Sequence, residues 1–204
     1  CFGMILDVAK RITEADRDIR EKGEYRMSPY MGTEIYEKTL GIIGLGDIGK
    51  RVARIAQGFS MKVLGVNKNG RAVAGVTLVT LETLLKESDV IVVTIPLTAE
   101  TEDLLSEKEF DLMKQGVLLV SIAREKIINK DAVLNAVNSG KVSGYGFDAE
   151  IMMPIKKDDP YLTSSRIVIT PHTASMTKEA DKAYADMTVE NINAFLSGKP
   201  IRVV

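Results

Sequence analysis

The only histidine among the 204 residues of this chain is a candidate proton donor. His172 follows a short apolar run and a proline in the segment RIVITPHTASMT, residues 166–177. Imidazole titrates near neutral pH and is the side chain most often used as a general acid or base. A single histidine is nevertheless more often a structural or solvated side chain, so this residue alone leaves both interpretations open.

A glycine-rich turn is the second candidate site, in the segment TLGIIGLGDIGKRVARIAQGF, residues 39–59. In such a turn Gly44 permits the tight bend, Gly46 lets the backbone approach a pyrophosphate, and Gly49 permits close helix packing. The helix that follows offers free N–H groups to the anion. An apolar run before it, a helical pattern after it and a second apolar run beyond predict a dinucleotide site. The candidate cofactor-binding residues of the turn are Gly44, Gly46, Asp47, Ile48 and Gly49.

The end of the second apolar run bears on the choice of cofactor. About twenty residues past the glycine turn, NAD-preferring sites place an acid on the adenosine ribose. Here the segment VNKNGR supplies Asn67 and then Lys68 and Arg71. An amide does not repel a 2′-phosphate, and the two cations could pair with one. The sequence therefore favours NADP over NAD, with Asn67 and Lys68 as contacts, although cations that are merely solvated would leave NAD open.

A sheet must position these residues, and its pattern begins near residue 39. Short runs rich in Val, Ile and Leu suit strands buried on both faces, and their alternation with helical patterns indicates an α/β protein. We therefore predict a Rossmann-type, doubly wound parallel sheet of about seven strands with helices on both faces. The strand candidates are residues 39–44, 61–66, 75–79, 89–96, 116–123, 141–148 and 166–170.

Helical patterns fill the remaining chain. Apolar residues recur at helical spacing over about residues 2–22, and a glycine-rich turn is followed by a helix with Ile48, Val52 and Ile55 on one face. We expect one dinucleotide-binding domain over residues 1–204, with flanking helices at 1–22 and 177–197. Cap signals support the helix boundaries. These signals are Gly23, the pair Ser106 and Glu109, Asn129, Gly140, Thr177 and Gly198.

Charge and composition narrow the classes of partner. The 27 basic and 28 acidic residues give a net charge of −1 and are interleaved, which argues against a basic face for nucleic acid or anionic lipid. The only cysteine is Cys1, which fits a reducing compartment, and no apolar run approaches a membrane span. We expect a cytoplasmic protein that acts on a small molecule and uses no metal.

Several segments taken together resemble the D-isomer-specific 2-hydroxyacid dehydrogenases. KTLGIIGLGDIGKRVA resembles the cofactor turn of that family, and IPLTAETEDLLSEKEFDLMKQGVLLVSIAR resembles its next signature. GYGFDAEIMMP followed by IVITPHTAS resembles the last one. The resemblance runs in order over nearly the whole chain. It implies hydride transfer between a nicotinamide dinucleotide and a 2-keto or D-2-hydroxy acid, in a homodimer.

The resemblance also implies roles for individual residues. Arg124, which ends the SIAR segment, falls on the arginine that grips the substrate carboxylate and keto oxygen, a contact that suits a guanidinium fork. His172 falls on the general acid and base that protonates the keto oxygen as hydride arrives. Further positions of this sequence match residues that line the dinucleotide. These are Pro96, Thr101, Ile122 and Asp148, the last near the nicotinamide carboxamide.

The sequence departs from the family pattern at several places. The glutamate that pairs with the catalytic histidine falls at Met153, whose thioether cannot support an imidazolium charge, and Glu150 could replace it only if the loop is rewound. Glu125 takes the place of a glycine and puts the geometry of the arginine turn in doubt, and Asn129 replaces an aspartate. Most of the family's substrate domain has no counterpart ahead of residue 1. We therefore expect the chain to bind dinucleotide and to turn over poorly.

Two other functional classes share parts of this sequence pattern. Some transcriptional corepressors resemble the same scaffold, and a non-catalytic, dinucleotide-sensing interaction module of that type would tolerate Met153 and a missing substrate half. The presence of both Arg124 and His172 favours the enzyme. An S-adenosylmethionine methyltransferase shares only the glycine turn and normally keeps the acid after the second strand.

Overall fold

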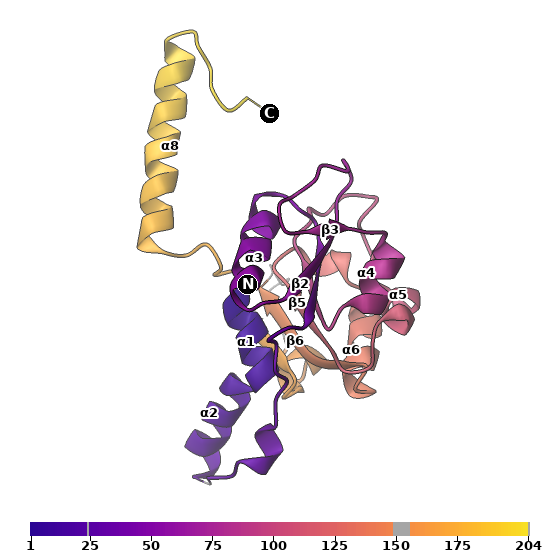
Figure 1. The fold of residues 1–204 in the computed structure, drawn as a ribbon. Helices are drawn as coiled ribbons and strands as arrows, with labels where there is room; N and C mark the ends of the chain where they lie inside the picture. The colour runs from indigo at the N-terminus through magenta and orange to yellow at the C-terminus, as the bar shows by residue number, and fades with distance from the viewer. Residues whose placement is uncertain (24, 149–155, 204) are drawn as a thin grey trace. The chain divides into compact units, whose positions relative to one another are not determined.

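The computed structural model describes residues 1–23, 25–148 and 156–203, which form two compact units. Residues 1–172 contain the sheet and the helices α1 to α7, and residues 173–204 contain helix α8 (Lys178–Leu196) (Figure 1). Our expectation of one dinucleotide-binding domain over the whole chain stays a prediction. Among the described residues, no helix has the length and apolar character that a membrane crossing requires.

A single seven-stranded parallel sheet forms the centre of the first unit, in the order β3-β2-β1-β4-β5-β6-β7. The predicted Rossmann-type sheet is confirmed, and each predicted apolar run contributes a strand. The chain winds from β1 toward β3 and then from β4 toward β7, so the order reverses between β1 and β4. In doubly wound sheets ligands bind at this switch point, outside the carboxyl ends of the strands. The strands are β1 (Thr39–Ile43), β2 (Lys62–Val66), β3 (Thr77–Leu78), β4 (Val90–Val93), β5 (Val117–Ser121), β6 (Val142–Asp148) and β7 (Ile167–Thr170).

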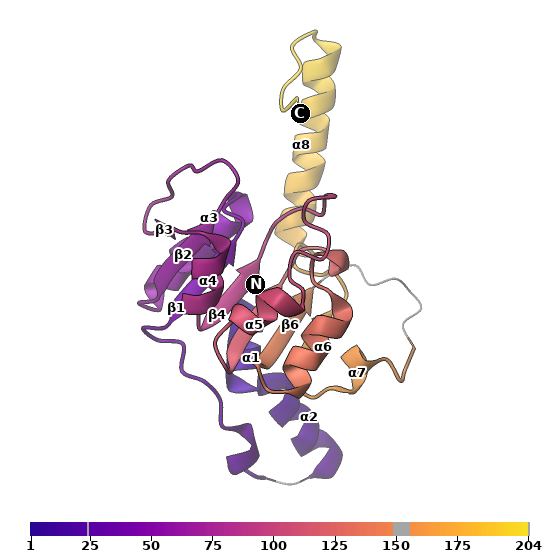
Figure 2. The same ribbon diagram turned by 90° about the vertical axis from the view of Figure 1, so that its right-hand side faces the viewer.

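Helices cover both faces of the sheet (Figures 1 and 2). Side chains of β5 alternate between the two faces, since Leu118 and Val120 pack with one buried cluster and Val117 and Leu119 with the other. Burial on both faces explains why this strand is apolar throughout. The first cluster includes α1 (Phe2–Lys10) and α3 (Asp47–Gly58), and the second includes α4 (Leu81–Glu87), α5 (Glu107–Leu112), α6 (Lys130–Asn138) and α7 (Pro160–Thr163).

The single helix predicted over residues 2–22 is wrong, because the chain forms α1 and then α2 (Ile12–Lys22) with a break at Arg11. The backbone of Arg11 is left-handed, with a φ of 54°. The carboxylate of Asp7 accepts hydrogen bonds from the backbone N–H and the hydroxyl of Thr13, at 2.8 and 2.5 Å. The bond to the N–H of Thr13 satisfies one of the donors that the first turn of the new helix leaves without an intrahelical partner.

The predicted apolar face of α3 is only partly right. Val52 is buried, but Ile48 and Ile55 are 52% and 45% exposed. A Cβ added at Gly49 would lie 2.0 Å from the carbonyl oxygen of Gly44, so the helix meets the glycine turn through its smallest residues. This close approach rotates the two isoleucines away from the sheet. The residues that α3 buries are Gly49, Val52, Ala53 and Ala56.

The predicted helix boundaries are otherwise confirmed. Ser106 and Glu109 form a reciprocal capping box at α5, and the side chain of Asn129 accepts the N–H of Ala132 at 3.1 Å. Thr177 caps α8 by accepting the N–H of Ala180 at 3.0 Å. The glycines predicted to end helices at 23, 140 and 198 all have positive φ angles. Helices α4 and α7, and the 3₁₀ turns Ser28–Tyr30 and Glu125–Ile127, were not predicted.

Candidate dinucleotide site

One row of paired residues crosses six strands and brings most of the predicted site residues to a single edge of the sheet. The row consists of Val66, Ile43, Val93, Ser121, Phe147 and Ile169. Because all the strands are parallel, the residues that follow this row lie at the same carboxyl edge. The predicted residues one to three positions past it are Gly44, Gly46, Asn67, Lys68, Pro96, Ile122, Arg124, Asp148 and His172.

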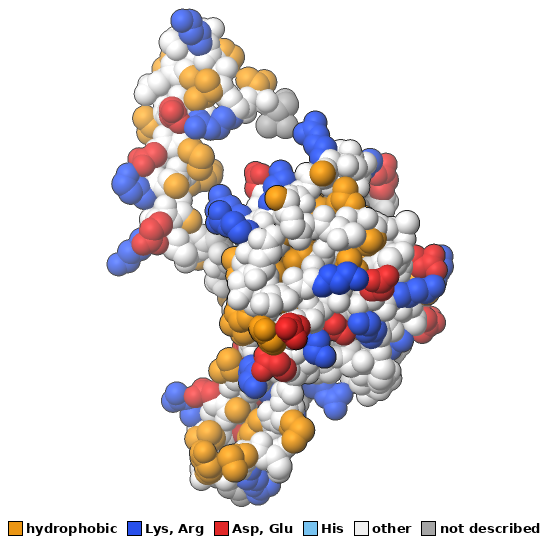
Figure 3. All heavy atoms as spheres, viewed as in Figure 1, with side chains coloured by type: hydrophobic (Ala, Val, Ile, Leu, Met, Phe, Trp, Pro, Cys, Tyr) orange, Lys and Arg blue, Asp and Glu red, His pale blue; other side chains and the backbone are white. Residues whose placement is uncertain are grey.

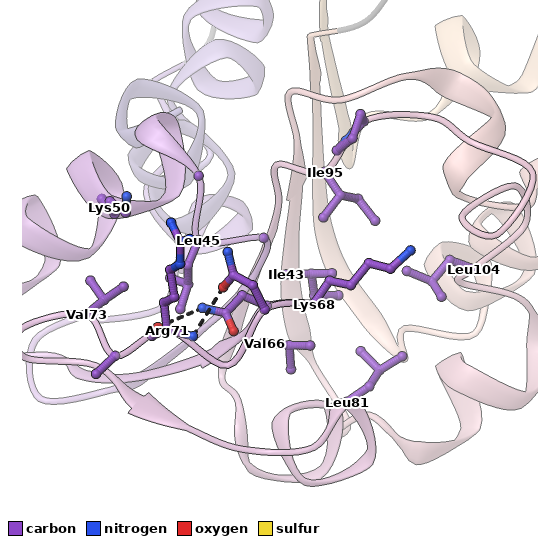
Figure 4. Close-up of a pocket in the computed structure, with 16 residues that line it drawn as sticks. Ile43, Leu45, Lys50, Val66, Lys68, Arg71, Val73, Leu81, Ile95 and Leu104 are labelled. Carbon is purple, nitrogen blue, oxygen red and sulfur yellow. Dashed lines mark hydrogen bonds between the residues drawn. The ribbon is translucent and has the colours of Figure 1, made fainter. Parts of the chain in front are cut away.

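A pocket of about 560 Å³ opens at the switch point, between the loops that follow β1, β2 and β4 (Figure 4). This volume is within the range of small-molecule and cofactor sites. Five of the predicted residues line it: Gly44, Gly46, Asn67, Lys68 and Pro96. Arg71, which the sequence offered as a partner for a 2′-phosphate, lines it too. Residues that were not predicted as contacts also line it, and these include Leu45, Lys50, Asn69, Val73, Leu81, Ile95 and Leu104.

The glycine turn forms one wall of the pocket. Gly44 has a φ of 104°, and a Cβ there would lie 2.6 Å from the Cγ2 of Ile95, so both conformation and space require glycine. Gly46 differs, because its φ of −71° suits any residue and its Cβ would meet no atom of the chain within 4 Å. Neither strain nor packing therefore accounts for glycine at position 46. An open backbone at the N-terminus of α3 fits the close approach of a phosphate.

Two other residues predicted to contact the cofactor at this turn lie at the start of α3, outside the pocket lining. Asp47 and Ile48 begin α3 with exposed side chains and are not among the residues that line the pocket. What this end of the helix offers a ligand is therefore backbone N–H groups. Asp47 lies in the first helical turn, where a negative side chain interacts favourably with the helix dipole.

The turn after β2 is held by its own amide side chains. The Nδ2 of Asn67 donates to the carbonyl oxygen of Arg71 at 2.9 Å, and the Oδ1 of Asn69 accepts the N–H of Arg71 at 3.1 Å. The Oδ1 of Asn67 is buried and has no hydrogen-bond partner among the described residues. A buried acceptor without a partner is uncommon, and a ribose hydroxyl is a donor of the kind that would satisfy it. The residues around this end of the pocket thus fit an adenosine ribose.

Lys68 reaches across the pocket from the same turn. Its side chain runs over the apolar part of the pocket toward Leu104, whereas Arg71 lies on the other side (Figure 4). The Nζ of Lys68 lies 2.7 Å from the Oε2 of Glu100, on the loop after β4. The hydrogen bond from Lys68 holds the pKa of the Glu100 carboxyl below its usual range.

Two predicted contacts, Thr101 and Ile122, hydrogen-bond to β4 or to the loop after it and do not line the pocket themselves. The hydroxyl of Thr101 donates to the carbonyl oxygen of Pro96 at 2.8 Å and accepts the N–H of Thr98 at 2.8 Å. Thr101 therefore fixes the loop that brings Pro96 to the pocket. Ile122 is half-buried against the cluster of α1 and α3, and its N–H donates to the carbonyl oxygen of Val93 at 3.3 Å. Neither residue is among those that line the pocket.

The predicted catalytic residues follow β5 and β7, with β6 between them. Arg124 is exposed and has extended backbone, and the next residue, Glu125, enters a 3₁₀ turn without positive φ. The glycine expected at position 125 is therefore not needed for this turn. His172 is exposed and has a φ of 55°, a conformation that is uncommon outside glycine and worth a functional explanation. Asp148, which ends β6, is only 3% exposed.

Some sequence interpretations concern residues 149–155. Met153 and Glu150, the two candidates for the partner of His172, lie outside the described residues. Elsewhere in the described chain, no group of three or more His, Cys, Asp or Glu residues is placed to hold a metal ion.

Comparison with known proteins identifies the family. Residues 2–174 match the D-isomer specific 2-hydroxyacid dehydrogenase, NAD binding domain. A glyoxylate reductase of Korarchaeum cryptofilum is 38% identical over 206 residues, which cover 97% of this chain and 62% of that protein. The chain thus spans less than two thirds of the length of this relative.

Solved structures give the same result at the level of the fold. An acyclic imino acid reductase in complex with NADPH and D-Arg has a TM-score of 0.91 at 35% identity, over 100% of this chain and 65% of that one. A D-lactate dehydrogenase from Aquifex aeolicus, complexed with NAD and lactic acid, has a TM-score of 0.84 at 33% identity, over 97% of this chain and 65% of that one. This chain belongs to the D-isomer-specific 2-hydroxyacid dehydrogenase family and comprises its NAD-binding domain.

Proposed function

We propose that this chain binds a nicotinamide dinucleotide and serves, in the whole protein, an oxidoreductase that interconverts a 2-keto acid and a D-2-hydroxy acid. The observation that carries the proposal is Gly46, an exposed glycine at a helix N-terminus, beside a pocket at the switch point. Family membership supports the cofactor class. Relatives named glyoxylate reductase and D-lactate dehydrogenase support the substrate class.

Two residues would act on the substrate and a third on the nicotinamide. The bound nicotinamide supplies or accepts the hydride. Arg124 binds the substrate carboxylate through its guanidinium fork and polarises the keto oxygen. His172 donates a proton to that oxygen during reduction and takes it back during oxidation. Asp148 ends β6, which lies between the strands that precede Arg124 and His172. In this proposal it lies near the carboxamide of the nicotinamide.

The cofactor we favour is NADP. Asn67 brings no negative charge to the ribose end of the pocket, and Arg71 and Lys68 both line it. A 2′-phosphate would therefore meet cations and no acid at the position where NAD-preferring sites carry one. Relatives have been solved with NADPH and with NAD, so the family accommodates both cofactors.

A homodimer is the assembly we propose. Apolar side chains gather on α2 and the segment after it, at the end of the first unit (Figure 3). Contiguous apolar patches of this kind mark interaction surfaces. Sedimentation of the chain and of the Met27→Asp, Met31→Asp double variant tests it, and a wild-type monomer would contradict it. The exposed residues are Ile12, Ile19, Tyr25, Met27, Met31 and Tyr36.

The experiment for the proposed function has two parts. Binding of NADPH and NADH to the chain is followed by the fluorescence of the reduced nicotinamide. Reduction of glyoxylate, hydroxypyruvate and pyruvate is then assayed in the full-length gene product. Arg124→Ala and His172→Ala should keep cofactor binding and lose about 10²-fold or more in turnover. Lys126→Ala, which removes a nearby exposed cation, is the matched control. Variants that turn over like the wild type would contradict the proposal.

A further inference from the structure

We propose that Glu100 is a specificity-determining residue, which competes with a 2′-phosphate for Lys68 and so limits the preference for NADP over NAD. The inference rests on the proposed function, because it assigns a role within the same dinucleotide site. Glu100 does not line the pocket and acts through the cation that does.

The position of Lys68 is the first observation. Its ammonium group is 2.7 Å from the carboxylate of Glu100, so the pair bridges the loops that follow β2 and β4. Figure 4 shows the side chain directed toward Leu104 and away from Arg71. The two cations of the ribose end are thus separated while the ion pair exists. A 2′-phosphate that engages both would have to draw Lys68 away from Glu100.

The loop that carries Glu100 is held in place by its own hydrogen bonds. The N–H of Glu100 donates to the hydroxyl of Thr98 at 3.3 Å, and the N–H of Thr101 donates to the carbonyl oxygen of Thr98 at 3.1 Å. The hydroxyl of Thr101 ties the same loop to Pro96. The backbone at Glu100 is therefore held in place, so the reach of its carboxylate toward the four-carbon side chain of Lys68 starts from a defined position.

The electrostatic effect of Glu100 differs between the two cofactors. A carboxylate at this place repels a 2′-phosphate and neutralises the lysine that would bind it. NAD carries a neutral hydroxyl at that position, and neither effect applies to it. Lys68 and Glu100 are 87% and 74% exposed, so the pair contributes little to folding and opens readily. Losing the carboxylate should strengthen NADPH binding by about three-fold.

The test compares Glu100→Gln with Glu102→Gln, a matched control on the same loop whose carboxylate lies 3.5 Å from Lys126 instead. The affinities of the chain for NADPH, NADH, adenosine 2′,5′-bisphosphate and adenosine 5′-monophosphate are measured by calorimetry. Glu100→Gln should raise the affinity for the two 2′-phosphorylated ligands by about three-fold and leave the others within about 1.5-fold. Glu102→Gln should change none of them.

A second comparison tests whether Glu100 acts through Lys68. In a Lys68→Gln background, the gain in NADPH affinity from Glu100→Gln should be smaller than in the wild-type background. In both backgrounds this gain should decrease as added salt screens the charges. An unchanged ratio of NADPH to NADH affinity in Glu100→Gln, or an equal shift of both, would overturn this inference alone. Failure of the wild-type chain to bind any of the four ligands would overturn the proposed function and the inference together.

Discussion

The hydroxyl of Thr170 donates a hydrogen bond of 2.5 Å to the carboxylate of Asp148, joining the last residues of β7 and β6. The carbonyl oxygen of the same Thr170 accepts the N–H of His172 at 2.9 Å. Asp148 is buried and His172 is exposed. Thr170 therefore links a buried carboxylate to the turn that presents the candidate proton donor.

Removal of this hydroxyl should destabilise the fold. Thr170→Val nearly preserves shape and takes one donor from a buried carboxylate, so we expect the free energy of unfolding to fall by about 1–3 kcal/mol. Urea denaturation measures this loss. Thr170→Ser keeps the hydroxyl and should lose less than about 1 kcal/mol. A Thr170→Val variant as stable as wild type, or one destabilised less than Thr170→Ser, would show that this hydrogen bond does not stabilise the fold.

His172 provides a probe of where the nicotinamide half lies. Because it is the only histidine in the sequence, its imidazole gives one assignable set of NMR signals. Addition of NADPH or NADH should shift those signals, since His172 lies at the same edge of the sheet as the pocket. Adenosine 2′,5′-bisphosphate lacks the nicotinamide and should leave them in place. Identical shifts with both kinds of ligand would argue against this orientation of the dinucleotide.

Asp89 predicts how stability depends on pH. Burial raises the pKa of this carboxyl, but hydrogen bonds from Lys114 at 2.8 Å and from the N–H of Thr39 at 2.9 Å outweigh it and hold the pKa below its ordinary value. A lowered pKa in the folded state stabilises the protein above the unfolded pKa, and this contribution is lost as pH falls through the folded value.

Asp89→Asn should therefore reduce the free energy of unfolding by about 1 kcal/mol near pH 7, after allowance for partial exposure. The difference from wild type should shrink as the pH falls through the lowered pKa of Asp89. Urea titrations at neutral and at acidic pH measure it. A deficit that stays constant with pH would show that the charge of Asp89 does not contribute.

Arg71 should matter for NADPH far more than for NADH. Arg71→Gln removes a guanidinium from the ribose end of the pocket, so we expect NADPH affinity to fall by about ten-fold and NADH affinity to change little. Calorimetric titration of both cofactors gives the two constants. Arg54→Gln on the exposed side of α3 is the matched control. An equal loss for both cofactors would remove the argument for a 2′-phosphate contact.

The parts of the site that the sequence predicts are those set by local backbone chemistry. Gly44 and Gly49 are required by a positive φ and a close approach, and both constraints appear in the sequence as a fixed spacing. Asn67 is found by counting from the same turn. The strands are predicted because burial on both faces leaves near-continuous apolar runs.

Other features depend on contacts between distant segments and leave no local signal. Leu81 begins α4 and Leu104 lies on the loop after β4, and the two line one pocket only because segments distant in the sequence meet there. The pair of Lys68 and Glu100 joins residues 32 positions apart. The break at Arg11 was missed for a different reason, since the apolar spacing of α1 continues past it.

Calorimetric titration of the Gly46→Ala chain with NADPH and NADH tests most directly whether the glycine turn before α3 binds the pyrophosphate. Since the added Cβ meets no atom of the chain within 4 Å, the free energy of unfolding should stay within about 0.5 kcal/mol of wild type. Gly58→Ala, at another open glycine of α3, is the control and should bind normally. We predict that Gly46→Ala lowers the affinity for both cofactors by about ten-fold or more. Wild-type affinity in a folded Gly46→Ala chain would contradict a pyrophosphate bound at this turn.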